Sequence, residues 1–221
     1  YERALEALVA AMLDPARSGP FLQSFGRFAP RAALLAALNS LSQLGLKAML
    51  PGVPDFYQGT ELWDLSLVDP DNRRAVDFEV RRRLMEHALE IPWLTLAEAW
   101  PNGTIKFALT SRLLAIRAAL RELFLEGDYE PLPVQGEDRA HVIAFARRHR
   151  GEAVIVIAGR HFSRSSSGGR VWPRGGFDAR IVSQGGEFFD LLTPTDAGPV
   201  TLDARVLLDT LPVAVVSSRP I

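Results

Sequence analysis

The stretch PGVPDFYQGTELWDLSLVDPDNRRAVDF, residues 51–78, decides how the fold of this chain is interpreted. It opens on residues that constrain the backbone, Gly52, Pro54 and Gly59, and it continues into a polar run at 69–74 with almost no apolar filler. Aromatic rings and hydrogen-bonding side chains lie between the two. A turn-rich, polar segment of this kind, set between amphipathic helices, is suited to present side chains to a polar ligand. We therefore expect the functional residues here.

Apolar residues at helical spacing predict helices on both sides of this stretch. The predicted helices span residues 2–13, 30–50, 78–90 and 105–123. A loop rich in Gly, Pro and Phe is expected over 14–29, and a short buried strand over 53–57. We expect Arg81–Arg83 to point outward, and Gly127 to cap the last helix.

The pattern changes after Asp128, where helical spacing gives way to short strands. The predicted strands span 142–147, 153–157, 180–183, 188–191, 200–208 and 213–217. Clusters of Gly, Pro, Ser and Asp separate them, as in an antiparallel sandwich. The chain is therefore predicted to be α+β, with one domain over 1–127 and a second over 128–221.

The opening stretch resembles the eighth-strand region of the maltooligosyltrehalose synthases, (β/α)8-barrel enzymes of the α-amylase superfamily similar to glycoside hydrolase family 13. The looser superfamily pattern, G-x-P-x-x-Y-x-G-x-E, is matched by Gly52, Pro54, Tyr57, Gly59 and Glu61. The run LVDPDNRR at 67–74 narrows the resemblance to the trehalose-forming branch. Residues 111–132 and 141–147 resemble the family's last barrel helix and the first strands of its C-terminal β-domain. Ala75 departs from the pattern, since proline is expected there, and makes the loop less rigid.

The resemblance implies that residues 1–127 form the C-terminal portion of a (β/α)8 barrel, mostly helical and built around strand eight, followed by a β-sandwich. A whole barrel takes about 250 residues, and a retaining glycosidase needs two carboxyl groups about 5 Å apart. In the superfamily the nucleophile, the acid/base and a third, stabilising aspartate lie on strands four, five and seven. We therefore expect no catalytic residue in this chain, which alone would be inactive. The parent would be a (1→4)-α-D-glucan 1-α-D-glucosylmutase, an isomerase without cofactor, that converts maltooligosaccharides to maltooligosyltrehalose by intramolecular transglycosylation.

The candidate substrate-binding residues are Tyr57, Gln58, Trp63, Asp69, Asn72, Arg73 and Arg74. Tyr57 is expected to stack on or hydrogen-bond a glucosyl ring, its alternative being a half-buried barrel aromatic. Asp69 and Arg73 are placed either as clamps on sugar hydroxyls or as an internal salt-bridge network that holds the loop. For Glu61 the resemblance favours a structural role, as the partner of a neighbouring loop.

Composition excludes several classes of function. The net charge of −1 argues against nucleic-acid binding, and no apolar run approaches the length of a membrane span. The chain has no cysteine, and cytoplasmic residence is the simplest interpretation. Of 25 basic residues only Lys47 and Lys106 are lysine, a skew from which we draw no functional conclusion.

No metal site is predicted. The acidic residues at 69–72 hint at a calcium loop, but the glycine and distal glutamate of that motif are missing. The four histidines show no spacing typical of zinc ligands.

Two other functions stay open. The chain could come from another glucan hydrolase or glucanotransferase of the superfamily, or it could be a carbohydrate-binding or structural module without chemistry of its own. In either case, one barrel strand with its helices leaves a sheet edge and apolar faces uncovered. We expect either a dimer through those exposed barrel faces or a rearrangement of residues 53–57.

Overall fold

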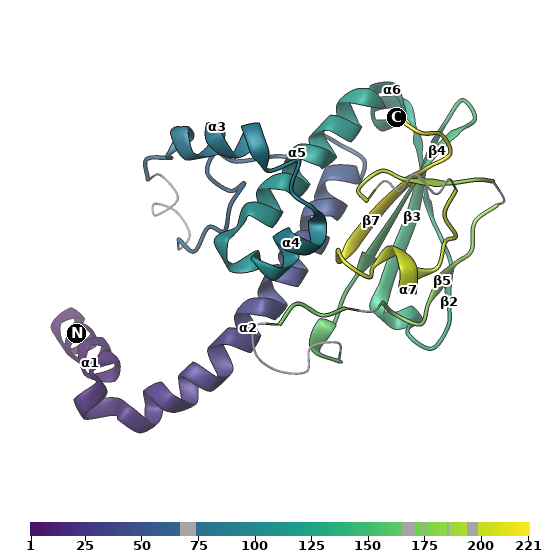
Figure 1. The fold of residues 1–221 in the computed structure, drawn as a ribbon. Coiled ribbons are helices and arrows are strands. Elements are labelled where there is room, and N and C mark those ends of the chain that lie inside the picture. Colours follow the sequence, from purple (N-terminus) through teal and green to yellow (C-terminus); the bar gives the residue numbers. More distant parts are fainter. Residues whose placement is uncertain (67–73, 165–170, 175, 185, 194–198) are drawn as a thin grey trace.

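A helical part comes first and an antiparallel β part follows, which confirms the α+β class (Figure 1). The computed structural model describes residues 1–66, 74–164, 171–174, 176–184, 186–193 and 199–221. Its helices are α1 (Glu2–Leu13), α2 (Pro15–Met49), α3 (Phe78–His87), α4 (Trp93–Glu98), α5 (Thr104–Ala119), α6 (Arg121–Glu126) and α7 (Ala204–Leu207), with 3-10 turns η2 (Trp100–Asn102), η3 (Arg139–His141) and η4 (Phe162–Arg164). None of the described helices is long and apolar enough to cross a membrane.

Helix α2 is longer than expected, and the predicted loop over 14–29 is wrong. The Asp14 carboxylate caps the helix by accepting a hydrogen bond from the Ala16 amide (2.9 Å), and the helix bends at Ser18 (φ −129°, ψ 31°). Pro20 falls just after this bend, where a missing amide proton costs little. Phe21, Phe25 and Phe28 continue a helical spacing that the prolines and glycines concealed.

The predicted strand over 53–57 is also wrong. These residues have no regular secondary structure, and the Val53 side chain is 92% exposed. A β-strand needs a neighbour about 4.8 Å away to satisfy its backbone groups, and none of the described strands pairs with this segment. The residues expected to form a strand are present, but without a neighbouring strand among the described elements they do not form one.

The last long helix is interrupted. Its backbone breaks at Leu120 (φ −112°, ψ 40°), which separates α5 from α6. Gly127 caps α6 as predicted, but with an extended backbone (φ −72°) rather than a left-handed one. Glycine is needed there for space, since a Cβ would lie 2.2 Å from the Leu123 carbonyl oxygen.

The β part contains two antiparallel sheets. Five strands are ordered β1-β3-β4-β7-β6, and a second pair is β2-β5. The bounds are β1 (Asp128–Pro131), β2 (Val134–Gln135), β3 (Val142–His149), β4 (Glu152–Gly159), β5 (Arg180–Ile181), β6 (Phe189–Asp190) and β7 (Val213–Ser217). The strand predicted over 200–208 is wrong, because the Asp203 carboxylate caps the short helix α7 through the Arg205 amide. The sandwich arrangement and the domain boundary at 127/128 stay predictions.

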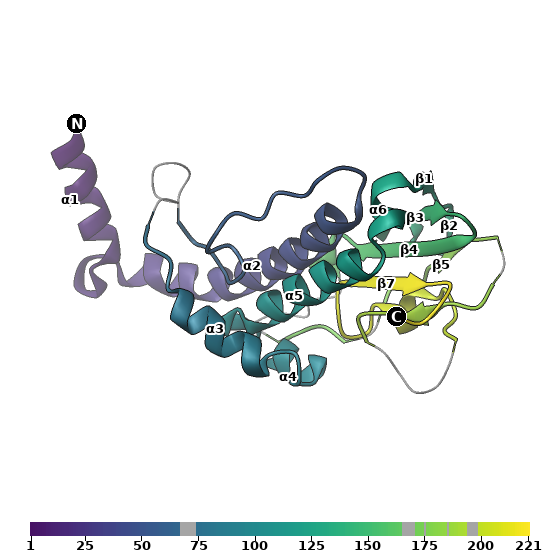
Figure 2. The same cartoon turned by 90° about the horizontal axis from the view of Figure 1, so that it is seen from above.

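The helical part and the sheet share one hydrophobic core. Helices α2 and α5 pack side by side and lead onto the sheet (Figure 2). Gly45 of α2 lies so near Val213 of β7 that a Cβ would come within 2.5 Å of its side chain. Buried Ser42 donates a hydrogen bond to the Pro212 carbonyl (3.1 Å) at the same contact. The end of α2 that precedes the decisive stretch is therefore held firmly.

Candidate functional site

The stretch after α2 turns sharply at residues 57–60. The Tyr57 carbonyl oxygen accepts hydrogen bonds from the Thr60 amide (3.2 Å) and the Thr60 hydroxyl (2.7 Å). Gly59 has a positive φ of 92°, a backbone conformation that favours glycine. The turn presents the Tyr57 side chain, 42% exposed, beside helices α2 and α5.

Arg81 ties residues 59–61 to the start of α3. The Arg81 guanidinium donates a hydrogen bond to the Glu61 carboxylate (2.8 Å), and others to the carbonyls of Gly59 (2.7 Å) and Asp77 (3.0 Å). Arg81 therefore points inward, against prediction, while Arg82 and Arg83 are exposed as expected. Glu61 is occupied by this loop contact, as a structural partner would be.

Trp63 anchors the next part of the stretch. Its indole Nε1–H donates a hydrogen bond to the Trp100 carbonyl (2.7 Å), and its ring packs against the core. The Lys106 ammonium lies 5.6 Å from the ring centroid. With its polar edge in use and its ring half-buried, Trp63 has less surface to offer a ligand than the sequence suggests.

Both lysines of the chain converge on one cavity of about 280 Å³. It is lined by Ser40, Gln43, Leu44, Lys47, Asp55, Phe56, Tyr57, Thr60, Lys106 and Thr110. The Lys47 ammonium donates to the Asp55 carbonyl (2.8 Å) and lies over the Phe56 ring (4.3 Å). The Lys106 ammonium donates to the Leu62 carbonyl (3.1 Å). Within the described ranges the ion pairs are formed by arginines rather than by these two lysines.

The pKa of Lys106 reflects both its burial and the second ammonium group nearby. Burial lowers the pKa of the Lys106 ammonium, and the positive charge of Lys47 lowers it further, against smaller opposite effects of Asp64 and Glu61. A polar ligand that accepts a hydrogen bond from the Lys106 ammonium would compensate part of the cost of its burial. Hydroxyl groups, amides and aromatic faces on the same walls suit a polyhydroxylated molecule.

The structure places the predicted residues unequally. Tyr57 lines the cavity, whereas Gln58 is exposed outside it and Trp63 lies behind Lys106. Arg74 is an exposed residue at the end of the loop. The remaining three candidates, Asp69, Asn72 and Arg73, lie outside the described residues.

Sequence reasoning missed the lysines. They come from α2 and α5, about 60 positions apart in the sequence, and only tertiary packing brings them together. One signal was available: a chain that uses arginine almost everywhere keeps lysine at these two positions alone. An ammonium is a compact, freely rotating donor, unlike the planar guanidinium. Among the described residues, no group of three His, Cys, Asp or Glu side chains is placed to hold a metal ion.

Comparison with known proteins gives the family. No family model matches the chain. It is 36% identical over 158 residues to a protein assigned as a maltooligosyl trehalose synthase in Mycobacterium tuberculosis, a match that covers 72% of this chain. The solved maltooligosyltrehalose synthase of Arthrobacter ramosus superposes on 97% of the chain with a TM-score of 0.71 and 30% identity. A second solved maltooligosyl trehalose synthase covers 98% with a TM-score of 0.73 and 28% identity.

These relatives are much longer than this chain. The chain spans 18% of the length of the curated relative and 26% of each of the two solved structures. The similarity nevertheless extends over both the helical part and the β part, since nearly the whole chain is superposed. The chain is therefore homologous to a part of the maltooligosyltrehalose synthases.

Proposed function

We propose that this chain is a part of an enzyme that converts maltooligosaccharides to maltooligosyltrehalose, a (1→4)-α-D-glucan 1-α-D-glucosylmutase. The observation that carries the proposal is the sequence and structural similarity to maltooligosyltrehalose synthases over nearly the whole chain. The substrate would be a linear glucan, and the reaction is an isomerisation. Its cytoplasmic location belongs to the same proposal.

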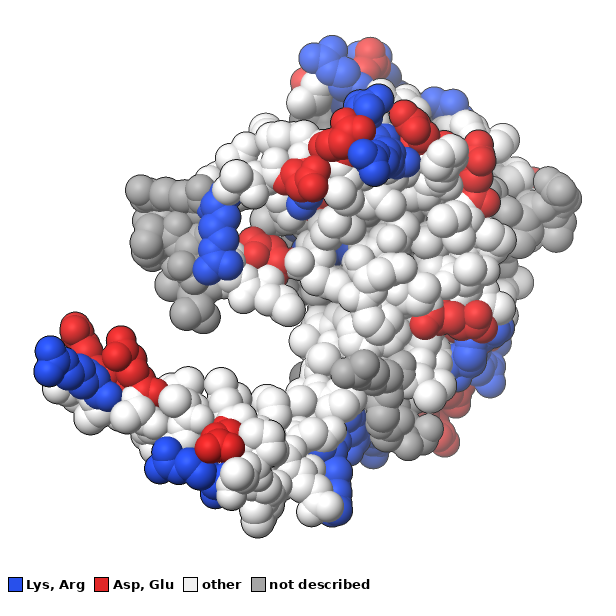
Figure 3. All heavy atoms as spheres, turned by 60° about the vertical axis from the view of Figure 1, so that its left-hand side comes forward, with Lys and Arg blue, Asp and Glu red and all other residues white. Residues whose placement is uncertain are grey.

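We further propose that the helical part is the segment of a (β/α)8 barrel around its eighth strand, and the β part a sandwich domain. The arm formed by α1 and the first part of α2 (residues 2–28, the α1–α2 arm) supports this, because its apolar side chains Leu5, Leu8, Phe25 and Phe28 are exposed. A hollow separates the arm from the body of the molecule (Figure 3). Other barrel elements of a longer chain would fill that hollow and pair with residues 53–57.

The chemistry would need groups beyond this chain. A carboxylate would attack the anomeric carbon of the penultimate glucosyl unit, while an acid protonates the departing O4 of the terminal glucose. The released glucose would then turn and attack the covalent intermediate through its anomeric hydroxyl, giving up that proton to the same acid/base group. The α-1,4 bond is lost and an α,α-1,1 bond forms. Glucose must be retained and water excluded in between.

The cavity beside Tyr57 would retain the released glucose. Its ammonium groups would donate hydrogen bonds to sugar hydroxyls, and the Tyr57 ring would cover an apolar face of the sugar. Gln58, Trp63, Asp69, Asn72, Arg73 and Arg74 are proposed to form the rim around it. Loss of a retaining contact should let glucose escape and water enter, which diverts the intermediate to hydrolysis.

The test is product analysis with the full-length enzyme and maltopentaose. Wild type should give a non-reducing isomer with little free glucose. Tyr57→Ala should raise the ratio of glucose to isomer about tenfold, the effect of losing about 1.4 kcal/mol of retention. Arg73→Ala should act in the same direction. Tyr129→Ala, at a tyrosine of similar exposure (45%) on β1, is the matched control and should leave the ratio unchanged.

The same assay separates the alternatives. A glucan hydrolase would release reducing sugars from the start, and a glucanotransferase would redistribute chain lengths without loss of reducing ends. The 221-residue chain alone should convert nothing. An unchanged ratio in both Tyr57→Ala and Arg73→Ala would remove this region from the reaction, and a product without α,α-1,1 bonds would overturn the proposed function.

A further inference from the structure

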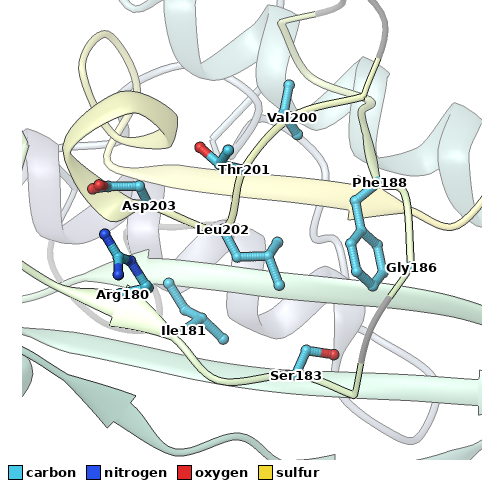
Figure 4. Close-up of a pocket in the computed structure, with 9 residues that line it drawn as sticks. All are labelled: Arg180, Ile181, Ser183, Gly186, Phe188, Val200, Thr201, Leu202 and Asp203. Carbon is cyan, nitrogen blue, oxygen red and sulfur yellow. The ribbon is translucent and has the colours of Figure 1, made fainter.

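A second cavity, of about 540 Å³, lies in the β part, beside β5 and the segment that leads into α7 (Figure 4). It is lined by Arg180, Ile181, Ser183, Gly186, Phe188, Val200, Thr201, Leu202 and Asp203. Its size is within the usual range of small-molecule sites, about 300–1,000 Å³. Nothing in the reaction described above uses it.

Backbone hydrogen bonds hold the walls of this cavity together. The Ile181 amide donates to the Leu202 carbonyl (3.0 Å), and the Val200 amide donates to the Phe188 carbonyl (2.6 Å). Arg180 and Asp203 form a further antiparallel bridge. Three separate segments of the chain are thus tied edge to edge, so the cavity is formed before any ligand arrives. A preformed site avoids part of the ordering cost of binding.

The cavity has an apolar side and a polar side. Ile181 and Phe188 are buried, and Leu202 extends between them, so the three side chains converge (Figure 4). The hydroxyls of Ser183 and Thr201 and the charged groups of Arg180 and Asp203 offer donors and acceptors around these side chains. A matching ligand has an apolar face and hydroxyl groups at its edge, which is the chemistry of a pyranose ring.

The charges favour a neutral ligand. The Arg180 guanidinium points toward the Asp203 carboxylate at one end of the cavity (Figure 4). Asp203 also forms an ion pair with Arg205 (3.3 Å). Burial raises the pKa of the Asp203 carboxyl, but hydrogen bonds from Arg205 and the charges of Arg205 and Arg180 outweigh it, so that the pKa lies below its ordinary value. With a carboxylate and a cation at the same end, a charged ligand meets repulsion from one of them.

We propose that this cavity binds one or two glucosyl units of a neutral α-linked glucan, as an accessory site apart from the cavity beside Tyr57. The identity of the sugar rests on the proposed function, while the preference for a neutral polyhydroxylated ring rests on the cavity itself. Such a site would hold a remote part of a glucan, or a second glucan, near the enzyme.

Titration of the 221-residue chain with maltotriose, followed by calorimetry, tests the proposal. We expect millimolar binding that is weakened about tenfold by the double substitution Arg180→Met and Thr201→Val, which removes hydrogen bonds worth about 1.4 kcal/mol together. Both side chains are exposed, so the fold should survive. Arg219→Met, at an exposed arginine of the same part that pairs with Glu152, should bind as wild type does.

Two further titrations locate the site and test its preference for a neutral ligand. Tyr57→Ala should retain the binding, and glucose 6-phosphate should bind more weakly than maltose. Absence of maltotriose binding, or binding that Tyr57→Ala abolishes and the double substitution leaves intact, would overturn the accessory site. Because the readout is binding to the chain rather than product formation, that failure would leave the product test of the proposed function standing.

Discussion

At the scale of single residues, Arg147 shows how a charge is kept inside this molecule by backbone carbonyls, since no ion pair of its guanidinium is found among the described residues. Its side chain is 2% exposed, and its guanidinium donates hydrogen bonds to the carbonyls of Asp128 (3.2 Å), Met49 (3.4 Å), Phe124 (3.2 Å) and Gly127 (2.8 Å). Burial lowers the pKa of this guanidinium, and the charge of Arg117 adds to the effect. The ends of two helices and a strand therefore meet at one guanidinium group. The partial negative charges of their carbonyl oxygens compensate its positive charge.

We predict that Arg147→Met lowers the free energy of unfolding by about 3 kcal/mol, because the carbonyls it serves lose their partner in the interior. Denaturation in urea, followed by circular dichroism, measures the change. Arg148→Met is the matched control. Its side chain lies on the opposite face of β3, paired with Glu130 (2.6 Å) near solvent, so the loss should stay below about 1 kcal/mol. Equal losses in the two variants would contradict the role given to Arg147.

At the scale of elements, the contact between α2 and β7 joins the helical part to the sheet. The approach at Gly45 leaves no space for a side chain, since Val213 Cγ2 lies 2.5 Å from the position of an added Cβ. Hydrogen bonds also connect the helical part to the β part. The Trp93 indole donates to the Leu192 carbonyl (2.6 Å), and the Arg112 guanidinium donates to the Leu191 carbonyl (3.0 Å). The interface therefore depends on close backbone approach as much as on apolar area.

We predict that Gly45→Ala costs about 1–3 kcal/mol, because the added methyl group forces Val213 or the helix to move. Gly26→Ala in the same helix is the control, since nothing lies within 4 Å of an added Cβ there. It should raise the stability slightly, by up to about 1 kcal/mol, as alanine is the better helix former. Denaturation of both variants measures their free energies of unfolding. An unchanged free energy of unfolding in Gly45→Ala would mean that the interface is loosely packed.

The same scale shows what the sequence could predict. The helix over 2–13 and the strands β3, β4 and β7 were found because long apolar runs with a clear period depend little on context. The strand over 53–57 failed for the opposite reason, as its residues fit a strand that has no partner among the described elements. Tyr57 was singled out because it ends the segment that resembles a barrel strand, and it lines the cavity although that strand does not form. Lys47 and Lys106 were not, because their meeting depends on how α2 packs against α5.

At the scale of the whole molecule, the α1–α2 arm projects from the body, and the described part of the chain leaves most of it uncovered (Figure 1). Helix α1 contains no buried residue, and the exposed stripe continues along α2 through Phe25 (55% exposed) and Phe28 (68%). Contiguous apolar surface of this kind marks an interaction face. In the longer enzyme the proposed barrel would cover it, whereas in the 221-residue chain a second copy is the available cover.

We predict that the 221-residue chain self-associates through this arm, with a weight-average mass that rises with concentration in sedimentation equilibrium. The double substitution Phe25→Ser and Phe28→Ser should lower the association constant at least tenfold, because it removes about 1.5–3 kcal/mol of apolar burial per side chain. Val206→Ser, an exposed apolar residue on α7 and remote from the arm, is the control and should associate as the parent does. A parent chain that stays monomeric at all concentrations would contradict the prediction, and association that survives the double substitution would place the contact elsewhere. The full-length enzyme should not respond to concentration in this way, since the surface that drives the association would already lie inside its barrel.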